Sequence, residues 1–230
     1  MPDTSGVPVT HIITKLERAI KEDQIKVFYS WLEGYVVGKK ELRRFYRKKG
    51  FVIPNSVLLE ITNQCNRRCI HCALPFDSNE TIPLDTMADI IGYFKARGTY
   101  VVGIIGGEPF LPAAREVLFN AAQIHRDIMF WVYTNGDFID ENVVSYLDQV
   151  TNIVPLISVD GTKDYHNSLR GEGSYEAVER ATRLLAERRL AKGHSITISK
   201  ENREILFEQE LLGLIKDDIV LCTLRYHAER

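Results

Sequence analysis

Three of the four cysteines in this chain stand close together, in the stretch CNRRCIHC. They are Cys65, Cys69 and Cys72, whereas Cys222 lies far along the sequence. Thiolate ligands favour zinc and iron–sulfur clusters over hard cations. A structural zinc site needs four ligands, and the fourth here would have to be His71, directly beside Cys72, or the remote Cys222. Neither choice is geometrically attractive.

A cubane of four irons held by three thiolates leaves one iron free to bind a substrate or cofactor. This chemistry suits an incomplete set of protein ligands, so we favour an iron–sulfur cluster on the three clustered cysteines. Zinc and dithiol redox chemistry in CIHC (69–72) are the alternatives, but a redox motif of that kind has no use for a third cysteine upstream. Cys222 is expected to pack as a small apolar side chain within a strand.

The elements that must position this loop alternate from about residue 55 onward. Short apolar, β-branched runs predict six strands, at 56–62, 100–106, 128–134, 152–159, 194–199 and 219–226. Amphipathic segments between them predict five helices, at 84–98, 112–126, 140–150, 174–193 and 201–216, with Asp140 and Ser174 as caps. The strand runs are almost continuously apolar, which is typical of parallel strands covered on both faces. The pattern predicts an α/β fold, a partial (β/α)6 barrel, rather than a doubly wound sheet.

Residues 1–52 are expected to form a helical extension ahead of a barrel core at residues 53–230. The extension contains a basic stretch, made of Lys39, Lys40, Arg43, Arg44, Arg47, Lys48 and Lys49. We interpret it as a solvated helix face, with an acidic peptide, a phospholipid headgroup or RNA as alternative partners. Because the chain stops shortly after the sixth expected strand, the core is expected to be truncated before its last covering helix.

Charge and hydropathy argue against several classes of protein. The 29 basic and 31 acidic residues give a net charge of -2, so no global field attracts nucleic acid, which we do not expect as a partner. No window approaches the roughly 20 apolar residues of a transmembrane segment, and no apolar signal run follows the N-terminus. We expect a cytoplasmic protein, in which reduced thiols are available as metal ligands.

The spacing CxxxCxxC is that of the radical S-adenosylmethionine (radical SAM) enzymes, and the chain resembles this superfamily at further positions in the same order. GGEP (106–109) follows the second expected strand, TNG (134–136) follows the third, and SVDG (158–161) lies on the fourth, ahead of HNSLRGEGSYE (166–176). The resemblance covers about residues 55–227, and the combined motifs are more specific than the cysteine spacing alone. The subfamily stays unassigned.

The resemblance implies a [4Fe–4S] cluster on Cys65, Cys69 and Cys72, with S-adenosylmethionine (SAM) bound to the open iron. An electron, from a donor such as flavodoxin or ferredoxin, then cleaves a carbon–sulfur bond and gives a 5′-deoxyadenosyl radical that abstracts hydrogen from a substrate. The motifs are closest to branches that act on peptides or cofactor precursors, and a lipid substrate also stays open. The competing hypothesis is a non-enzymatic module, stapled by zinc, whose basic N-terminal helix contacts RNA or a lipid surface.

The resemblance also implies which residues hold SAM, while it assigns no catalytic residue. The expected cofactor-binding residues are Gly106, Gly107, Glu108, Pro109, Thr134, Asn135, Ser158, Asp160, Arg170 and His71. The GGEP turn is expected at the methionine ammonium and the TNG turn at the nucleoside. Ser158 and Asp160, two apart on one strand, are expected to share a face at the ribose or methionine end. Arg170 is expected at the cofactor carboxylate, and the ring of His71 near adenine.

Ordinary structural explanations exist for the same residues. Without the cysteines, GGEP, TNG and SVDG would each indicate a turn, and Arg170 one half of a surface ion pair. The ends of the fifth and sixth expected strands supply further candidates for the mouth of the site, which are Ser199, Arg225, Tyr226 and His227.

Overall fold

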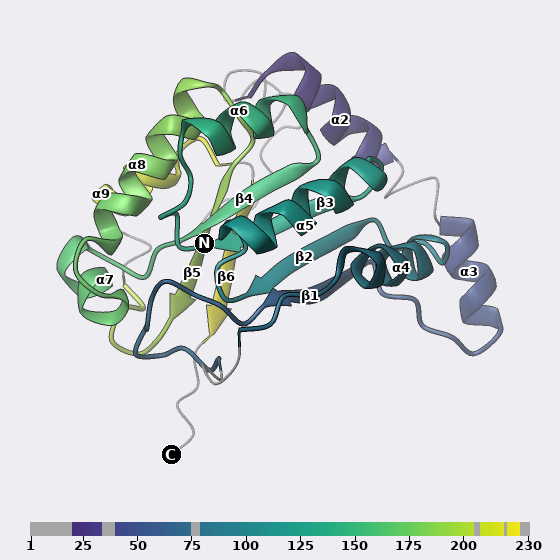
Figure 1. Ribbon diagram of the computed structural model, residues 1–230, viewed down its shortest axis with the longest axis horizontal. Helices are drawn as coiled ribbons and strands as arrows, with labels where there is room; N and C mark the ends of the chain where they lie inside the picture. The colour runs from purple at the N-terminus through teal and green to yellow at the C-terminus, as the bar shows by residue number, and fades with distance from the viewer. Residues whose placement is uncertain (1–19, 34–39, 75–78, 205–207, 219, 226–230) are drawn as a thin grey trace, which may run out of the picture.

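The computed structural model describes residues 20–33, 40–74, 79–204, 208–218 and 220–225 (Figure 1). In this part of the chain, six parallel strands form one sheet in the order β1-β2-β3-β4-β5-β6. The strands are β1 (Ser56–Thr62), β2 (Val101–Gly106), β3 (Met129–Thr134), β4 (Ile153–Ser158), β5 (Gly193–Ile198) and β6 (Val220–Arg225). The helices are α2 (Glu22–Glu33), α3 (Lys40–Lys48), α4 (Leu84–Lys95), α5 (Pro112–Ile124), α6 (Glu141–Gln149), α7 (Lys163–Arg170), α8 (Ser174–Glu187) and α9 (Gln209–Ile215). The expected alternation of strands and helices is confirmed.

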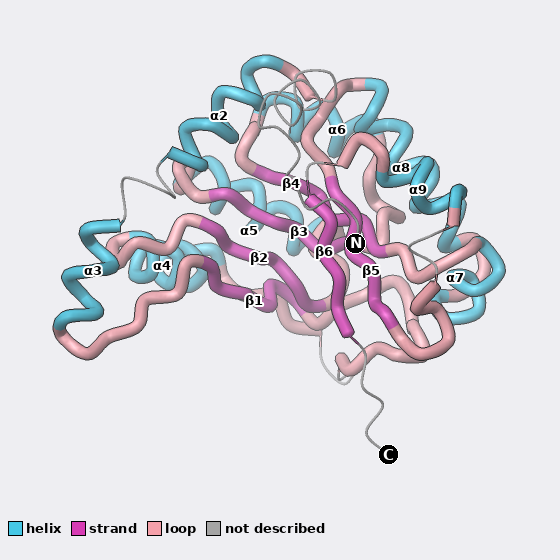
Figure 2. Tube along the Cα trace, turned by 180° about the vertical axis from the view of Figure 1, so that it is seen from behind, coloured by secondary structure: helices cyan, strands magenta, loops and turns pink. Residues whose placement is uncertain are grey.

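Helices α4, α5, α6 and α8 lie behind the sheet in Figure 2, and the strands face the viewer. The central strands β2 and β4 are buried along most of their length, as their apolar runs predict. Strand β1 differs, because its first five residues alternate between exposed and half-buried, and Leu58 is 63% exposed. The expectation that the strands are covered on both faces is therefore wrong for β1, an edge strand on the open side of the sheet.

The structure confirms one of the two expected helix caps and corrects the other. Asp140 caps α6 as expected, because its Oδ1 accepts from Val143 N at 2.9 Å. Ser174 does not cap α8: the residue before the helix is Gly173, whose φ of 74° is left-handed. The side chain of Asn167 in α7 accepts from Tyr175 N, in the first turn of α8, at 2.9 Å. Helix α8 ends at Glu187, well before the expected limit.

Two further segments depart from the expected pattern. Helix α7 overlaps the start of the stretch 166–176, which the sequence indicated only as a motif. Within 201–216 the described helix is α9 alone, and residues 205–207 lie outside the described part of the chain. Asn202 holds the preceding turn, because its Nδ2 donates to the carbonyl oxygens of Asp160 and Thr197. Such side-chain bonds to backbone groups compete with a helix.

The start of α2 packs into the barrel core. Ile20 and Ile25 are buried in the same apolar cluster as the sheet residues. Gln24 Oε1 accepts from Ala191 N at 2.6 Å, and Lys21 N donates to the carbonyl oxygen of Arg189 at 3.0 Å. These contacts tie residues 20–25 to the segment between α8 and β5, across the expected boundary at residue 52.

Helix α3 carries most of the basic stretch and has no buried residue. This agrees with the interpretation of the stretch as a solvated helix face. No helix in the described ranges is long and apolar enough to cross a membrane.

Candidate functional site

A cavity of about 380 Å³ opens at the carboxyl ends of the strands, next to the cysteine loop, residues 63–74. Parallel βα folds build their sites at this edge because the loops that follow the strands meet there. The lining residues that the motifs predicted are Cys65, Cys69, His71, Cys72, Gly106, Gly107, Glu108, Thr134, Asn135, Ser158 and Arg170. The others are Leu58, Leu74, Ile105, Tyr133, Ser195 and Thr197. The fold thus brings the separate motifs to one cavity.

The three motif cysteines are free thiols, and each is partly buried. Burial raises the pKa of the Cys65 and Cys69 thiols, and the charge of Arg170 opposes this rise for Cys69. A metal that binds them must displace protons. Three soft donors at one cavity fit an iron–sulfur cluster with one open iron. In the described ranges, no three His, Cys, Asp or Glu side chains form a ready set of ligands for a metal ion.

The two glycines of GGEP lie against the chain itself. A Cβ on Gly106 would stand 2.3 Å from the carbonyl oxygen of Thr62, and one on Gly107 only 1.8 Å from that of Gln64. Gly107 N donates to Thr62 O at 2.6 Å, and Glu108 N donates to Gln64 O at 2.8 Å. Backbones approach this closely only where no side chain intervenes. The glycines therefore join the GGEP turn to the start of the cysteine loop, and a contact with SAM stays a prediction.

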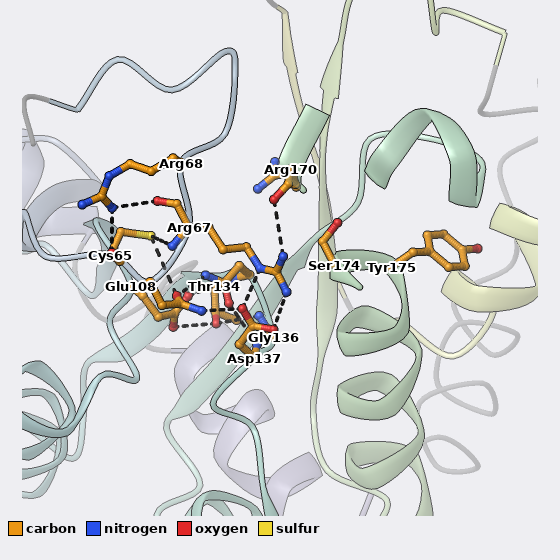
Figure 3. A network of polar contacts seen from close by, with 12 residues as sticks. Cys65, Arg67, Arg68, Glu108, Thr134, Gly136, Asp137, Arg170, Ser174 and Tyr175 are labelled. Carbon is orange, nitrogen blue, oxygen red and sulfur yellow. Dashed lines mark hydrogen bonds and ion pairs between the residues drawn. The ribbon is translucent and has the colours of Figure 1, made fainter. Parts of the chain in front are cut away.

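Glu108 borders the cavity, but its side chain is fully buried between the ends of β2 and β3 (Figure 3). Its Oε1 accepts from Phe110 N at 3.0 Å and from Thr134 Oγ1 at 2.7 Å, and its Oε2 accepts from Asn135 N at 2.9 Å. Burial raises the pKa of this carboxyl to about 7, against the lowering effect of the three hydrogen bonds. The side chain braces the GGEP turn against the TNG turn.

Asp160 does not line the cavity, contrary to the expectation that it shares a face with Ser158. Strand β4 ends at Ser158, so the alternation of faces no longer applies two residues later. The buried carboxylate of Asp160 accepts from Arg170 Nε at 2.5 Å and from Arg170 Nη2 at 3.3 Å. Burial acts to raise the pKa of Asp160, but the charge and hydrogen bonds of Arg170 hold it below its ordinary value. Arg170 is thus a nearly buried cation, not half of a surface pair.

Two histidines adjoin this ion pair. His71 lines the cavity with its Nε2 3.7 Å from Asp160 Oδ2, and His166 Nδ1 accepts from Asp160 N at 3.1 Å. Burial lowers the pKa of both rings, that of His166 to about 4, and the charge of Arg170 lowers both further. The rings are therefore neutral near pH 7, which leaves Asp160 and Arg170 as the charged groups at this wall.

The remaining predicted residues lie elsewhere. Pro109 is buried and does not line the cavity. Ser199 is also outside the lining, with its Oγ 3.2 Å from Tyr165 Oη. Tyr226 and His227 lie outside the described residues, as do the side chains of Arg225 and Cys222.

Sequence reasoning missed the residues that hold the cysteine loop. Arg67, between Cys65 and Cys69, donates from Nε and Nη2 to the two carboxylate oxygens of Asp137, at 2.6 Å each (Figure 3). Asn66 Nδ2 donates to the same carboxylate. The sequence shows both Arg67 and Asp137 beside motifs, since Arg67 lies within CNRRCIHC and Asp137 directly follows TNG. It does not show that they pair, because 70 positions separate them.

Sequence reasoning also missed Ser195 and Thr197, which line the cavity from β5. Ser195 pairs in register with Ser158 on β4, so hydroxyl side chains from neighbouring strands stand side by side. The alternation of residues along the fifth expected strand was a usable signal.

The model of the family described as the radical SAM superfamily matches residues 59–206, more than half of the chain. This chain belongs to the radical SAM superfamily. Proteins of this family use a [4Fe–4S] cluster and SAM, the cofactors that the motifs implied. The thiols, the cavity and its polar lining fit both, and the zinc-stapled binding module gains no support.

Curated relatives of this radical SAM protein include several maturation proteins. It is 31% identical over 143 residues to the mycofactocin maturase MftC of Mycobacterium tuberculosis, covering 60% of this chain and 36% of the relative. It is 26% identical over 152 residues to the Fe-coproporphyrin III synthase of Methanosarcina barkeri, covering 64% of this chain and 37% of the relative. It is 24% identical over 158 residues to the sporulation killing factor maturation protein SkfB of Bacillus subtilis, covering 66% of this chain and 38% of the relative. The chain spans little more than a third of the length of these relatives.

Solved radical SAM structures share the fold. SuiB of Streptococcus suis bound to SAM superposes with a TM-score of 0.68 at 19% identity, covering 81% of this chain and 44% of SuiB. The protein anSMEcpe with bound SAM gives a TM-score of 0.61 at 21% identity, covering 75% of this chain and 51% of anSMEcpe. These likenesses confirm the expected partial barrel.

Proposed function

We propose that this chain is the catalytic core of a radical SAM enzyme, with a [4Fe–4S] cluster on Cys65, Cys69 and Cys72 and SAM in the adjoining cavity. The observation that carries the proposal is that three free thiols share one cavity with the GGEP and TNG turns, which follow different strands of one sheet. Bound there, the cluster would supply the electron for reductive cleavage of SAM, and the resulting radical chemistry would remove a hydrogen atom from the substrate.

The role of the protein chain is to bind and orient SAM beside the cluster. Arg170, fixed by Asp160, offers a cation to the methionine carboxylate from the cavity wall. Ser158 offers a hydroxyl to the nucleoside from the end of β4, and the TNG turn forms the neighbouring part of the cavity wall. Leu58 and Ile105 add apolar surface to the lining of the cavity.

A peptide is the substrate class that the relatives favour. MftC and SkfB are named as maturation proteins, and SuiB, with a TM-score of 0.65 in this form, was solved bound to its precursor peptide SuiA. The Fe-coproporphyrin III synthase makes a cofactor precursor the second candidate.

The electron is assigned to a low-potential donor of the flavodoxin or ferredoxin type, because reductive cleavage of SAM consumes one electron that a donor must supply. We place the reaction in the cytoplasm, where reducing conditions keep free thiols available as ligands.

Substitution of one cysteine tests the cluster. After anaerobic reconstitution, the wild-type chain should be brown, contain iron and sulfide, and release 5′-deoxyadenosine from SAM with dithionite. Cys69→Ala should lose both the iron and the release, because two thiolates cannot hold the cluster, while circular dichroism stays unchanged. Cys222→Ala, outside the motif, is the matched control and should behave as wild type. Retained release by Cys69→Ala would falsify the assignment.

The substrate class needs a separate measurement. Peptides encoded beside this gene, made with deuterated amino acids, should pass deuterium into 5′-deoxyadenosine, because the radical takes its hydrogen from the substrate. Transfer from deuterated coproporphyrin, without transfer from any peptide, would replace the peptide by a cofactor precursor.

A further inference from the structure

The spacer between the first two cluster cysteines is bound to one carboxylate. Asn66 and Arg67 both direct their side chains to Asp137, and neither lines the cavity. Arg67 and Asp137 form a two-pronged ion pair, the geometry that a guanidinium and a carboxylate match best. Their side chains are only 13% and 18% exposed, so water screens this pair much less than it screens a surface pair.

Asp137 is itself fixed in place. Its backbone N donates to Asn135 Oδ1 at 2.9 Å, and its carbonyl oxygen accepts from Arg180 Nη2 of α8 at 3.0 Å. Asn135 Nδ2 also donates to Asn66 Oδ1 at 2.9 Å. The turn between β3 and α6 therefore offers the cysteine loop an anchor that cannot swing away without breaking several bonds.

The loop is attached on its other side to the end of α7. Ile70 N donates to the carbonyl oxygen of Leu169 at 2.9 Å, and Arg67 Nη1 approaches that of Arg170 at 3.4 Å (Figure 3). Arg67 therefore spans from the β3–α6 turn to α7, and protein contacts hold the loop from both flanks.

From this geometry we propose that Asp137 is a positioning residue that holds the Cys65–Cys69 spacer in its cluster-receiving conformation before the cluster is assembled. The proposal rests on the proposed function, since it presumes that the cysteines bind a cluster. In Asp137→Asn, the loss of the carboxylate charge leaves Arg67 partly buried without its partner, and the new amide turns a donor group toward other donors. Loss of such outer partners of metal ligands typically weakens binding on the order of 10- to 100-fold.

Chelator resistance measures the effect in the loaded protein. Iron transfer to bathophenanthroline should be at least about 10-fold faster from Asp137→Asn than from wild type. Arg67→Lys should be intermediate, because lysine keeps the charge but cannot fork onto both oxygens. Asp140→Ala is the matched control from the same loop: it loses the cap of α6 and unfolds at a lower temperature, yet should release iron at the wild-type rate.

Hydrogen exchange of the metal-free chain separates this inference from the function on which it rests. Amides of residues 65–72 should exchange faster in Asp137→Asn than in wild type, with no such change in Asp140→Ala. Unchanged loop exchange in Asp137→Asn overturns the proposal, and so does equal chelator resistance in a loaded protein. A wild-type chain that assembles no iron and sulfide overturns the proposed function instead, and loop exchange then still decides whether Asp137 positions the cysteines.

Discussion

At the level of single residues, Gly107 shows that a motif expected at a ligand also serves the fold. GGEP is expected to approach SAM, yet the structure shows its glycines pressed against residues 62–64 of the chain. Cavity and cysteine loop therefore share one backbone contact. A side chain at Gly107 would disturb both, whatever the ligand.

Alanine substitutions at two glycines test this contact. Gly107→Ala should lower the free energy of unfolding by about 2–4 kcal/mol, because its Cβ would displace the carbonyl of Gln64 and break two backbone hydrogen bonds. Gly92→Ala, in α4 with open space around the new methyl group, should raise it by about 0.5–1 kcal/mol. Denaturant unfolding of the metal-free chains measures both, and equal effects would rule out the tight contact.

The buried carboxyl of Glu108 predicts a pH dependence of stability. Its pKa lies near 7 in the folded chain, against an ordinary value of 4.5 for a solvated glutamate, so the folded state holds the proton more tightly than the unfolded state. The stability that this group contributes is complete below about pH 4.5 and is lost as the pH rises through 7. Between pH 5.5 and 8 the difference in unfolding free energy between wild type and Glu108→Gln should shrink by about 2 kcal/mol. A difference that stays constant with pH would contradict the raised pKa.

At the level of elements, β5 and the start of β6 are joined by buried charges at the end of the sheet opposite the cavity. Asp218 Oδ1 accepts from Lys192 Nζ at 3.1 Å, and its Oδ2 lies 2.6 Å from His194 Nδ1. His194 Nε2 in turn lies 3.0 Å from Thr182 Oγ1 of α8. All but Thr182 have side chains less than 5% exposed, so each depends on its partner.

Removing Asp218 should loosen this end of the sheet. Asp218→Ala leaves the Lys192 cation buried without a counterion and should lower the free energy of unfolding by about 3–5 kcal/mol. Asp217→Ala, at the exposed neighbouring position, should change it by less than about 0.5 kcal/mol. Thermal unfolding of both variants makes the comparison, and a similar loss in the two would show that the network contributes little.

At the level of the whole molecule, the cavity is a product of the curved sheet. Its lining comes from five consecutive strands and the loops after them, so no single element contains the site. The start of α2 packs against the opposite end of the sheet, beside the segment before β5 (Figure 1). The cavity and the contacts of residues 20–25 therefore lie at opposite ends of one core.

The sequence by itself determined the α/β alternation, the strand positions, the close spacing of three cysteines and the motifs at successive strand ends. These features are local: apolar runs, turn residues and the spacing of ligands in one loop appear within a few positions of each other. The same locality explains the errors at Ser174 and in 201–216, where Asn167 and Asn202 reach backbone groups that no short pattern contains.

Only the tertiary structure decided which polar groups meet. Packing of the strands brings together three pairs of residues that stand far apart in the sequence: Arg67 with Asp137, Gly107 with Gln64, and Gln24 with Ala191. Asp160 was placed at the cavity by strand alternation, but the strand had ended and burial required the partner that Arg170 supplies. A buried charge must find its counterion within reach in space, and a sequence read along one dimension does not show that distance.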